Sequence, residues 1–263
     1  MRMTFPRFLI LIFGLLLTAC AGFEPEVVTA TPPPPTPTPP QTPTTVWFPP
    51  TATPTPQPVR TQLPTPEMLT GLGELIASDD FNDPEEWDTA VSDEGSASIS
   101  RDRLTLVAQP GVYMTSLQRQ MVLGNFYAEV TARPSLCRGG DEYGFMVRAS
   151  AVTYYRFSLT CDGQAHAERI SLNERHDLQE PVFSGDVPPG APGEVRIGVW
   201  ASGAELRLFL NGRFQFSFTD LNLSSGTVGV FARAAGDTPV TVAFSNLRVR
   251  SVEYFPPTRT PAP

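Results

Sequence analysis

The chain contains no lysine, and all 19 of its basic residues are arginine. It has 27 acidic residues and only two histidines, which leaves a formal net charge of −8 at neutral pH. An acidic chain repels phosphate backbones, so we expect no nucleic-acid partner. An all-arginine set favours planar contacts with carboxylates and aromatic rings, because the guanidinium is a flat fork of donors.

The apolar run at residues 8–17 is too short to cross a bilayer as a finished helix. It follows Arg2 and Arg7 and precedes small residues. This order of charged, apolar and small residues is typical of a signal peptide, which we predict over residues 1–19.

The stretch from Leu17 to Cys20, LTAC, resembles the lipobox of bacterial lipoproteins, with leucine three residues before the cysteine and small residues between them. The resemblance implies cleavage before Cys20 and a lipid on its thiol. Such a protein is held on the outer face of the cell membrane. The alternative is an ordinary secretory signal with a chance cysteine at its end.

Cysteine is scarce, and besides Cys20 the chain has Cys137 and Cys161 alone. An exported protein meets no reducing thiol pool, and the strand pattern below places both cysteines at one end of a sheet. We therefore predict a disulfide. Zinc is the competing explanation, but His166 and His176 do not supply the short paired spacings of a structural zinc site.

Core-forming side chains are rare in residues 20–74 and again in residues 253–263, where proline and threonine dominate, as in TPPPPTPTPPQTPTT and FPPTRTPAP. Such composition cannot offset the entropy of ordering, so we predict a disordered tether after the lipid and a similar tail. A proline-rich tether of this length extends on the order of 100 Å. Residues 75–252 between them are predicted to form one domain.

Helical periodicity is nearly absent from residues 75–252. Runs such as RLTLVA, YYRFSLT and AELRLFL alternate apolar with polar residues, as half-buried strands do. Asp162-Gly163 and Asn211-Gly212 lie between pairs of such runs and favour hairpin turns. The pattern predicts an all-β, antiparallel β-sandwich with about a dozen strands.

The same alternation assigns side chains to the two faces of each strand. Tyr127 and Glu129 point away from the core on one strand, Arg148 on the next, and Tyr154 and Arg156 on a third. If these consecutive strands form a meander, the five side chains make one patch of rings and planar groups suited to binding a sugar. The alternative is a solvated sheet face held by Arg–Glu pairs.

Short motifs along the domain resemble the concanavalin A-like lectin and glucanase superfamily, which includes laminin G-like modules and 3-keto-disaccharide hydrolase domains. They are Asp80-Phe81 with Pro84 and Trp87, YGFMVRA, YYRFSLTCDG, LFLNGRF, SGTVGVFA and FSNLRV. The resemblance implies an antiparallel jelly-roll β-sandwich. It leaves the activity open, because one fold hosts many functions.

The spacing of the carboxylates identifies no catalytic residue. Glucanases of this superfamily place Glu-x-Asp-x-x-Glu on one strand, so that nucleophile and acid face the same sugar. Here Glu86 and Asp88 are followed by Val91 instead of the second glutamate. Glu129 has Thr131 two residues on, so its partner carboxylate is missing.

Calcium is the one cofactor that the resemblance suggests for this chain. Many jelly-roll sugar binders hold a structural calcium between the chain ends, and Asp79 and Asp80 supply carboxylates at the start of the domain. Where many relatives have aspartate near the end, this chain has Ser245, so calcium binding stays open. No other cofactor is expected.

These features predict a lipid-anchored extracytoplasmic protein that displays a non-catalytic, glycan-binding β-sandwich, with the membrane and a polysaccharide as partners. Two alternatives from other classes remain. One is a glycoside-active enzyme related to the 3-keto-disaccharide hydrolases, and the other is a protein-adhesion or structural module.

Overall fold

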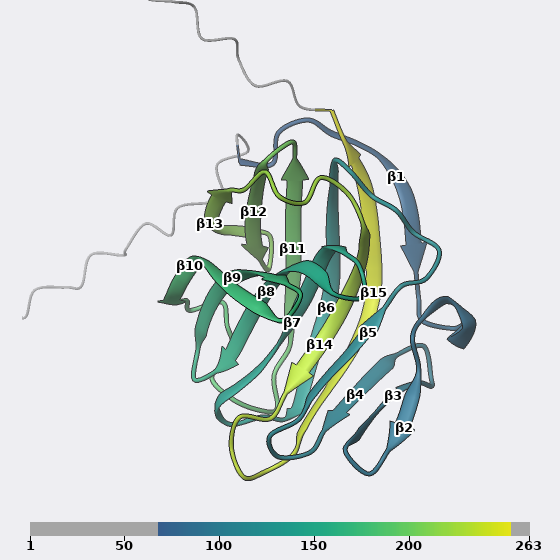
Figure 1. The fold of residues 1–263 in the computed structure, drawn as a ribbon, viewed down its shortest axis with the longest axis vertical. Helices are drawn as coiled ribbons and strands as arrows, with labels where there is room; N and C mark the ends of the chain where they lie inside the picture. The colour runs from purple at the N-terminus through teal and green to yellow at the C-terminus, as the bar shows by residue number, and fades with distance from the viewer. Residues whose placement is uncertain (1–67, 254–263) are drawn as a thin grey trace, which may run out of the picture. The chain divides into compact units, whose positions relative to one another are not determined.

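The computed structural model describes residues 68–253, which form two antiparallel β-sheets (Figure 1). The all-β prediction is confirmed, and no helix in this range is long and apolar enough to cross a membrane. In chain order the elements are β1 (Leu72–Asp79), the 3-10 helix η2 (Pro84–Glu86), β2 (Ala90–Ser92), β3 (Gly95–Ile99), β4 (Leu104–Ala108), β5 (Tyr113–Leu117), β6 (Phe126–Leu136), β7 (Gly139–Ala149), β8 (Thr153–Cys161), β9 (Gln164–Ser171), β10 (Glu174–Phe183), β11 (Val195–Ser202), β12 (Glu205–Leu210), β13 (Arg213–Thr219), β14 (Thr227–Arg233) and β15 (Val240–Val252).

Nine strands form the first sheet, in the order β13-β12-β11-β6-β15-β4-β3-β2, with β1 also paired to β15. The second sheet has six strands in the order β10-β9-β8-β7-β14-β5. The long strand β15 therefore has β6 along one side, and β4 and then β1 along the other. Figure 1 shows β1 alongside β15.

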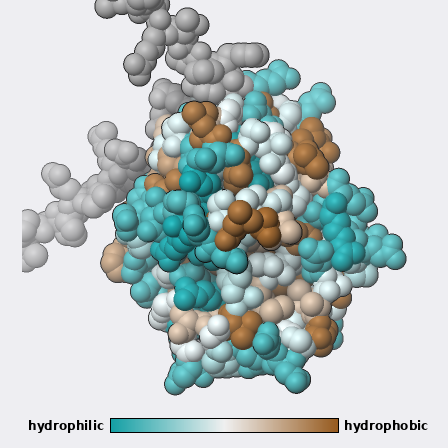
Figure 2. Space-filling view, viewed as in Figure 1, coloured by the Kyte–Doolittle hydropathy of each residue, from teal (hydrophilic) through white to brown (hydrophobic). Residues whose placement is uncertain are grey.

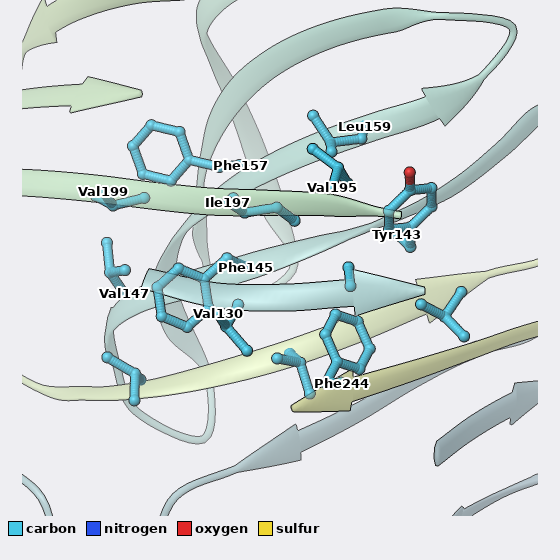
Figure 3. Packing of buried hydrophobic residues seen from close by; sticks show 14 of the residues in the cluster. Val130, Tyr143, Phe145, Val147, Phe157, Leu159, Val195, Ile197, Val199 and Phe244 are labelled. Carbon is cyan, nitrogen blue, oxygen red and sulfur yellow. The ribbon is translucent and has the colours of Figure 1, made fainter. Parts of the chain in front are cut away.

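The core lies between the two sheets and is filled by alternate residues of their strands (Figure 3). Phe145 and Phe157 of the six-stranded sheet and Val130, Ile197 and Phe244 of the nine-stranded sheet are fully buried in it. Each such side chain contributes about 1.5–3 kcal/mol relative to an exposed one. The period-2 pattern in the sequence is thus the pattern of burial in the structure.

Both predicted hairpin turns are present. Asn211 and Gly212 join β12 to β13 with φ values of 53° and 79°, a conformation that asparagine and glycine tolerate better than other residues. Asp162 and Gly163 join β8 to β9, and Gly163 has a φ of 96°. The residues of these turns therefore determine one strand pair in each sheet, β12–β13 and β8–β9.

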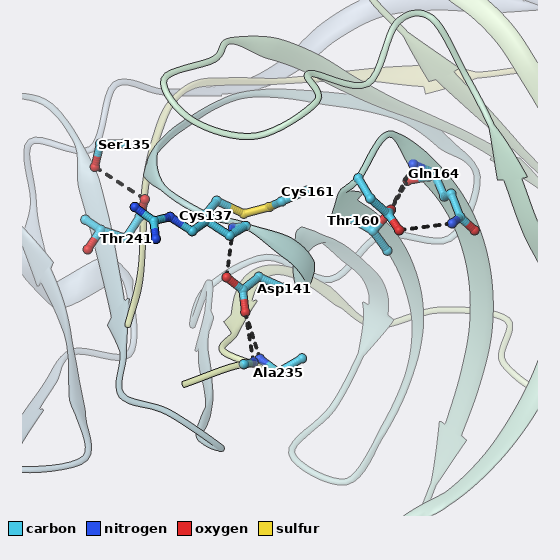
Figure 4. The surroundings of a disulfide bond; sticks show 11 residues. Ser135, Cys137, Asp141, Thr160, Cys161, Gln164, Ala235 and Thr241 are labelled. Atoms are coloured by element: carbon cyan, nitrogen blue, oxygen red, sulfur yellow. Dashed lines mark hydrogen bonds between the residues drawn. A yellow bond between two sulfur atoms is a disulfide. The ribbon is translucent and has the colours of Figure 1, made fainter. Parts of the chain in front are cut away.

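The predicted disulfide between Cys137 and Cys161 is confirmed, with Cα atoms 5.8 Å apart (Figure 4). Cys137 follows β6 of the nine-stranded sheet and Cys161 ends β8 of the six-stranded sheet. Beside it, the buried Asp141 carboxylate accepts hydrogen bonds from the amides of Arg138 and Ala235, each at 2.9 Å. The bond and the carboxylate together hold the corner where the chain crosses between sheets.

The surface is mixed in polarity, and on the side in view in Figure 2 apolar residues form separate patches among hydrophilic ones. Single exposed apolar side chains are normal in soluble domains. Strand β1 differs, because Leu72, Leu75 and Ile76 are 41%, 50% and 52% exposed on one short strand.

Candidate functional site

The five side chains predicted to form one patch lie on two different sheets. Strand β6, which carries Tyr127 and Glu129, pairs with β11 and β15 and not with β7. Strands β7 and β8, which carry the other three, belong to the six-stranded sheet. The predicted meander of three neighbouring strands is therefore wrong, because the chain crosses from one sheet to the other after β6.

Tyr127 and Glu129 form a small cluster on the outer face of the nine-stranded sheet. The Tyr127 hydroxyl donates to Glu129 Oε2 at 3.1 Å, and Arg196 Nε lies 3.4 Å from the same oxygen. Tyr127 is only 7% exposed and lies against Gly198, where a Cβ would sit 2.5 Å from its hydroxyl oxygen. Burial raises the pKa of Tyr127, and so does the adjacent Glu129 carboxylate. The ring is thus a packed group here and offers little surface for stacking.

Arg148 is not the outward-facing donor that alternation predicted. Its φ is 47°, and the pairing of β7 with β14 is interrupted by a bulge next to it. The side chain is 1% exposed and donates to the carbonyl oxygens of Leu223, at 2.8 Å, and Gly124, at 3.1 Å. Burial lowers the pKa of this guanidinium. Its hydrogen bonds to the two carbonyl oxygens hold the loops that contain Gly124 and Leu223 in place.

Tyr154 and Arg156 do lie together, on the side of β8 that faces away from the core. We call this side of the second sheet the outer six-stranded face. Its central members, taken across β9, β8, β7, β14 and β5, are His166, Glu168, Tyr154, Arg156, Ser158, Gly144, Met146, Gly229, Phe231 and Tyr113. Most of them are buried although they point away from the core, so the face is hollowed and its polar groups are largely shielded from water.

A buried ion pair occupies the β8–β9 half of this face. Arg156 donates to Glu168 Oε2 through Nη2 and through Nε, the latter at 2.9 Å, and Glu168 is 1% exposed. Arg175 of β10 lies 2.7 Å and His166 lies 3.4 Å from the other carboxylate oxygen. Burial raises the pKa of Glu168, but the adjacent His166 imidazole and the charge of Arg156 outweigh it and lower that pKa to about 2. The carboxylate is therefore ionised throughout the physiological range.

Within residues 68–253, four side-chain atoms on this face have no hydrogen-bond partner. Two are Ser158 Oγ and His166 Nδ1, which come from residues directly opposite each other on β8 and β9, and the others are the carboxylate oxygens Glu142 Oε2 and Glu168 Oε1. Ser158 is fully buried and His166 is 4% exposed. A buried polar atom without a partner costs free energy, so such atoms are rare and each needs an explanation, such as an ordered water or a ligand group.

Rings and a thioether make up the other half of the face. Phe231, Met146 and Ala149 form a buried apolar cluster outside the main core, against which Tyr113 and Tyr154 pack. The Arg156 guanidinium carbon lies 5.3 Å from the ring centres of both Tyr113 and Phe231. The arginine thus joins the apolar half to the ion pair.

Two glycines create the room for these groups. A Cβ at Gly144 would overlap the carbonyl oxygen of Phe157 and lie 2.9 Å from the Phe231 ring. A Cβ at Gly229 would lie 2.5 Å from Leu117 and 2.9 Å from Met146. A larger residue at Gly144 would displace the Phe231 ring, and one at Gly229 would displace the Leu117 and Met146 side chains.

A pocket of about 230 Å³ opens at the β5 side of this face, and Tyr113, Met146, Tyr154 and Ser150 are among its lining residues. A larger cavity of about 460 Å³ lies beside the disulfide, where Arg138 is its one charged lining residue. We place the site at the smaller pocket, because two tyrosine rings line it and Arg156 of the buried ion pair lies over one of them, Tyr113.

Sequence reasoning found Tyr154 and Arg156 of this site and missed Tyr113, His166 and Glu168. Glu168 and His166 alternate with Ala167 in the run AHAERI, so their common face was readable. Their position opposite β8 follows from the Asp162-Gly163 hairpin. Tyr113 could not be placed, because β5 reaches this sheet only through β14.

The predicted calcium ligand Asp79 is engaged by the protein. Its carboxylate accepts hydrogen bonds from the Phe81 amide at 2.7 Å and the Trp87 indole at 2.6 Å. Residues 68–253 contain no group of three or more histidine, cysteine, aspartate and glutamate side chains placed to hold a metal ion. Calcium binding at this end of the domain was left open by the sequence and stays untested.

No protein-family model matches the chain, and no curated protein matches its sequence. Solved structures match its fold. A β-glucanase from Bacillus licheniformis aligns with a TM-score of 0.52 at 10% identity, over 69% of this chain and 99% of that one. A Bacillus subtilis protein with a galectin-like fold gives 0.51 at 12% identity, over 70% and 99%. A variant of LamA from Z. galactanivorans, solved with laminaritriose and laminaritetraose, gives 0.50 at 11%, over 68% and 100%.

These likenesses confirm the fold implied by the sequence motifs: the described domain is an antiparallel jelly-roll β-sandwich similar to those of the β-glucanase and the galectin-like protein. At such identities the likeness concerns the fold alone.

Proposed function

We propose that the chain is a lipid-anchored extracytoplasmic protein whose jelly roll binds a glycan on the outer six-stranded face without cleaving it. The observation that carries this proposal is the pair of buried polar atoms without a hydrogen-bond partner in residues 68–253, Ser158 Oγ and His166 Nδ1, on the same sheet face as the partly buried rings of Tyr113 and Tyr154. A sugar hydroxyl donates and accepts at once, so one ligand group can serve both atoms.

The composition of the face fits a sugar better than a purely apolar ligand. Sugars present apolar C–H faces to rings and hydroxyls to planar donors and carboxylates. Tyr113 and Tyr154 line the pocket, while Arg156 and Glu168 are fixed beside it by their mutual hydrogen bonds. Groups held in place before binding lose little entropy when the ligand arrives.

The carboxylates of the face favour binding over hydrolysis. A glycosidase needs one carboxyl that holds a proton, and Glu168 with a pKa of about 2 does not. Glu142 also lies on this face, but it pairs in register with Thr160, four residues along β8 from Arg156. That spacing is about 13 Å along the strand, whereas catalytic carboxyls lie about 5–9.5 Å apart.

Asp177 is the carboxylate directly opposite Glu168, on β10. Arg175 pairs with both, at 2.8 Å from Asp177 Oδ1 and 2.7 Å from Glu168 Oε1. Arg175 therefore occupies the space between the Glu168 and Asp177 carboxylates, where a glycosidase would bind the glycosidic bond. The adhesion alternative has no residue-level support comparable to the unpartnered atoms.

A screen of the mature chain on a broad glycan array, with and without calcium, tests the binding function. We expect retention of at least one neutral or weakly charged glycan without release of reducing sugar. Release of reducing sugar would support the enzyme alternative. Failure to retain any glycan would leave adhesion as the better explanation.

The membrane anchor rests on the LTAC stretch, which lies outside the described residues. We expect wild-type protein in the membrane fraction and the Cys20→Ala variant in the soluble extracytoplasmic fraction. A Cys20→Ala variant that stays in the membrane pellet as fully as the wild type would contradict the lipid anchor.

A further inference from the structure

Four arginines lie across the outer side of three adjacent strands of the nine-stranded sheet, opposite the candidate glycan site. They are Arg133 on β6, Arg196 on β11, and Arg248 and Arg250 on β15, and we call them the arginine face. Three of them are exposed and Arg133 is half-buried. Such a cluster is unexpected in a chain of net charge −8.

The acidic side chains between these arginines do not neutralise the face. Glu129 lies 3.4 Å from Arg196, and Glu194 accepts from Arg133 at 2.8 Å. Within residues 68–253, Arg248 and Arg250 make no ion pair, and Arg250 has a carbonyl contact of 3.3 Å to Gly73. Two of the four arginines in the described domain are therefore outside any ion pair, although Glu129 of β6 lies in register with Arg248 of β15.

Strand β1 places exposed aliphatic side chains next to this charge. Leu75 is in register with Arg250 of β15, and Ser78 with Arg248. Leu72, Leu75 and Ile76 are each at least 41% exposed. Aliphatic side chains beside arginines are the chemistry of a surface that enters the headgroup region of an anionic bilayer.

A glycan is a poorer fit to the arginine face. Stacking needs an open ring, but Tyr127, Trp200 and Phe209 on this side are at most 7% exposed, and Phe214 is partly buried against them. Met68 and Leu69 pack against them, and Trp200 Nε1 donates to the carbonyl oxygen of Thr70. The chain thus enters the domain across these rings, and β1 follows directly.

We infer that the arginine face and the exposed side chains of β1 form a contact surface for an anionic lipid bilayer. The contact turns the outer six-stranded face, on the opposite sheet, away from the lipid. Its biological setting rests on the proposed membrane anchor, but the contact itself does not need the lipid on Cys20. It can therefore fail or hold independently of the anchor and of glycan binding.

Vesicle co-sedimentation tests the contact, with the chain from residue 20 onward carrying Cys20→Ala so that no lipid is attached. We expect binding to vesicles of phosphatidylcholine with phosphatidylglycerol, weak binding to phosphatidylcholine alone, and loss of binding as salt is raised. Replacing Arg196, Arg248 and Arg250 by glutamine should weaken partitioning on the order of 100-fold, or about fivefold per arginine.

The matched control replaces Arg101, Arg103 and Arg138 by glutamine, which changes the net charge equally at sites outside the arginine face. It should partition like the wild type. Glu74→Gln on β1 removes an opposing charge and should strengthen binding. Equal losses in both triple variants, or binding that does not depend on phosphatidylglycerol, would overturn the inference. A third outcome would also overturn it. In that case the chain binds neither kind of vesicle but retains an acidic polysaccharide, and the variant of Arg196, Arg248 and Arg250 loses that retention.

Discussion

The two sheets carry arginine–glutamate pairs on their outer faces, but the pairs differ in their exposure to water. The side chains of Arg156 and Glu168 on the six-stranded sheet are 9% and 1% exposed. Those of Arg196 and Glu129 on the nine-stranded sheet are 50% and 22% exposed. In sequence both sets look alike, as charged residues at alternate positions of a strand.

This difference shows that a side chain can point away from the core and still be shielded from water. The six-stranded face is hollowed, with glycines at Gly144 and Gly229 that let Phe231 and Met146 lie low against the backbone. Charges in such a hollow are fixed and poorly hydrated, which suits short-range recognition. Charges on the open face of the other sheet are hydrated, and they act on a partner through their summed field.

The largest difference should appear when the arginine of each pair is removed. Arg156→Met leaves the buried Glu168 carboxylate without its main partner and should lower the free energy of unfolding by about 3–5 kcal/mol. Arg196→Met breaks an exposed pair and should cost less than about 1 kcal/mol. Denaturant unfolding of both variants measures this, and similar losses would show that the two faces do not differ as described.

The buried pair also predicts a dependence of stability on pH. The folded-state pKa of Glu168 is lowered from 4.5 to about 2, so its contribution is complete above pH 4.5 and is lost as pH falls toward 2. Unfolding measured across that window should show a smaller acid-induced loss in Glu168→Gln than in the wild type. An unchanged slope would mean that this carboxylate is not held ionised by its partners.

Reducing the disulfide should affect the local stability of the two sheets to different extents. The bond closes a separation of 24 residues, and its loss should lower the free energy of unfolding by about 3 kcal/mol. Cys161 pairs with the start of β7, so amide exchange should quicken in β7 and β8 more than in β11 and β12. Uniform quickening across both sheets would contradict a local role at the crossover.

Local patterns in the sequence predicted much of the fold. Alternation identified the core side of β6, β7 and β8, and the Asn211-Gly212 and Asp162-Gly163 turns fixed two strand pairs. The cysteines were predicted to pair at one end of a single sheet, and they do pair, although Cys137 follows a strand of one sheet and Cys161 ends a strand of the other. These features depend on residues close together in the chain, which is where sequence reasoning is strongest.

The candidate site was predicted only in part, because its formation depends on distant pairings. Alternation shows that Glu129 points outward, but it does not show that β6 pairs with β11 and β15, whose sequences come much later. It also misplaced Arg148, since a bulge beside a residue with positive φ breaks the period of two. The burial of the outward Arg156 follows from the hollow of the whole sheet, which no single strand encodes.

Replacing either of two buried serines, Ser158 and Ser116, by alanine should change stability only slightly, and in opposite directions. Ser158 Oγ has no hydrogen-bond partner, so Ser158→Ala should raise the free energy of unfolding by about 1 kcal/mol. Ser116, equally buried but on the core side of β5, donates to the Asp88 carbonyl at 2.7 Å. Ser116→Ala should therefore lower stability by about 1 kcal/mol. Thermal unfolding of the two variants checks the opposite signs.

The most direct test of the central claim is the retention of the best glycan from the array by these two variants. If the outer six-stranded face binds the sugar, the more stable Ser158→Ala variant loses at least about tenfold in affinity, equal to about 1.4 kcal/mol for one hydrogen bond. The less stable Ser116→Ala variant binds like the wild type. Undiminished binding by Ser158→Ala, or equal losses in both variants, would contradict the assignment of the glycan site to this face.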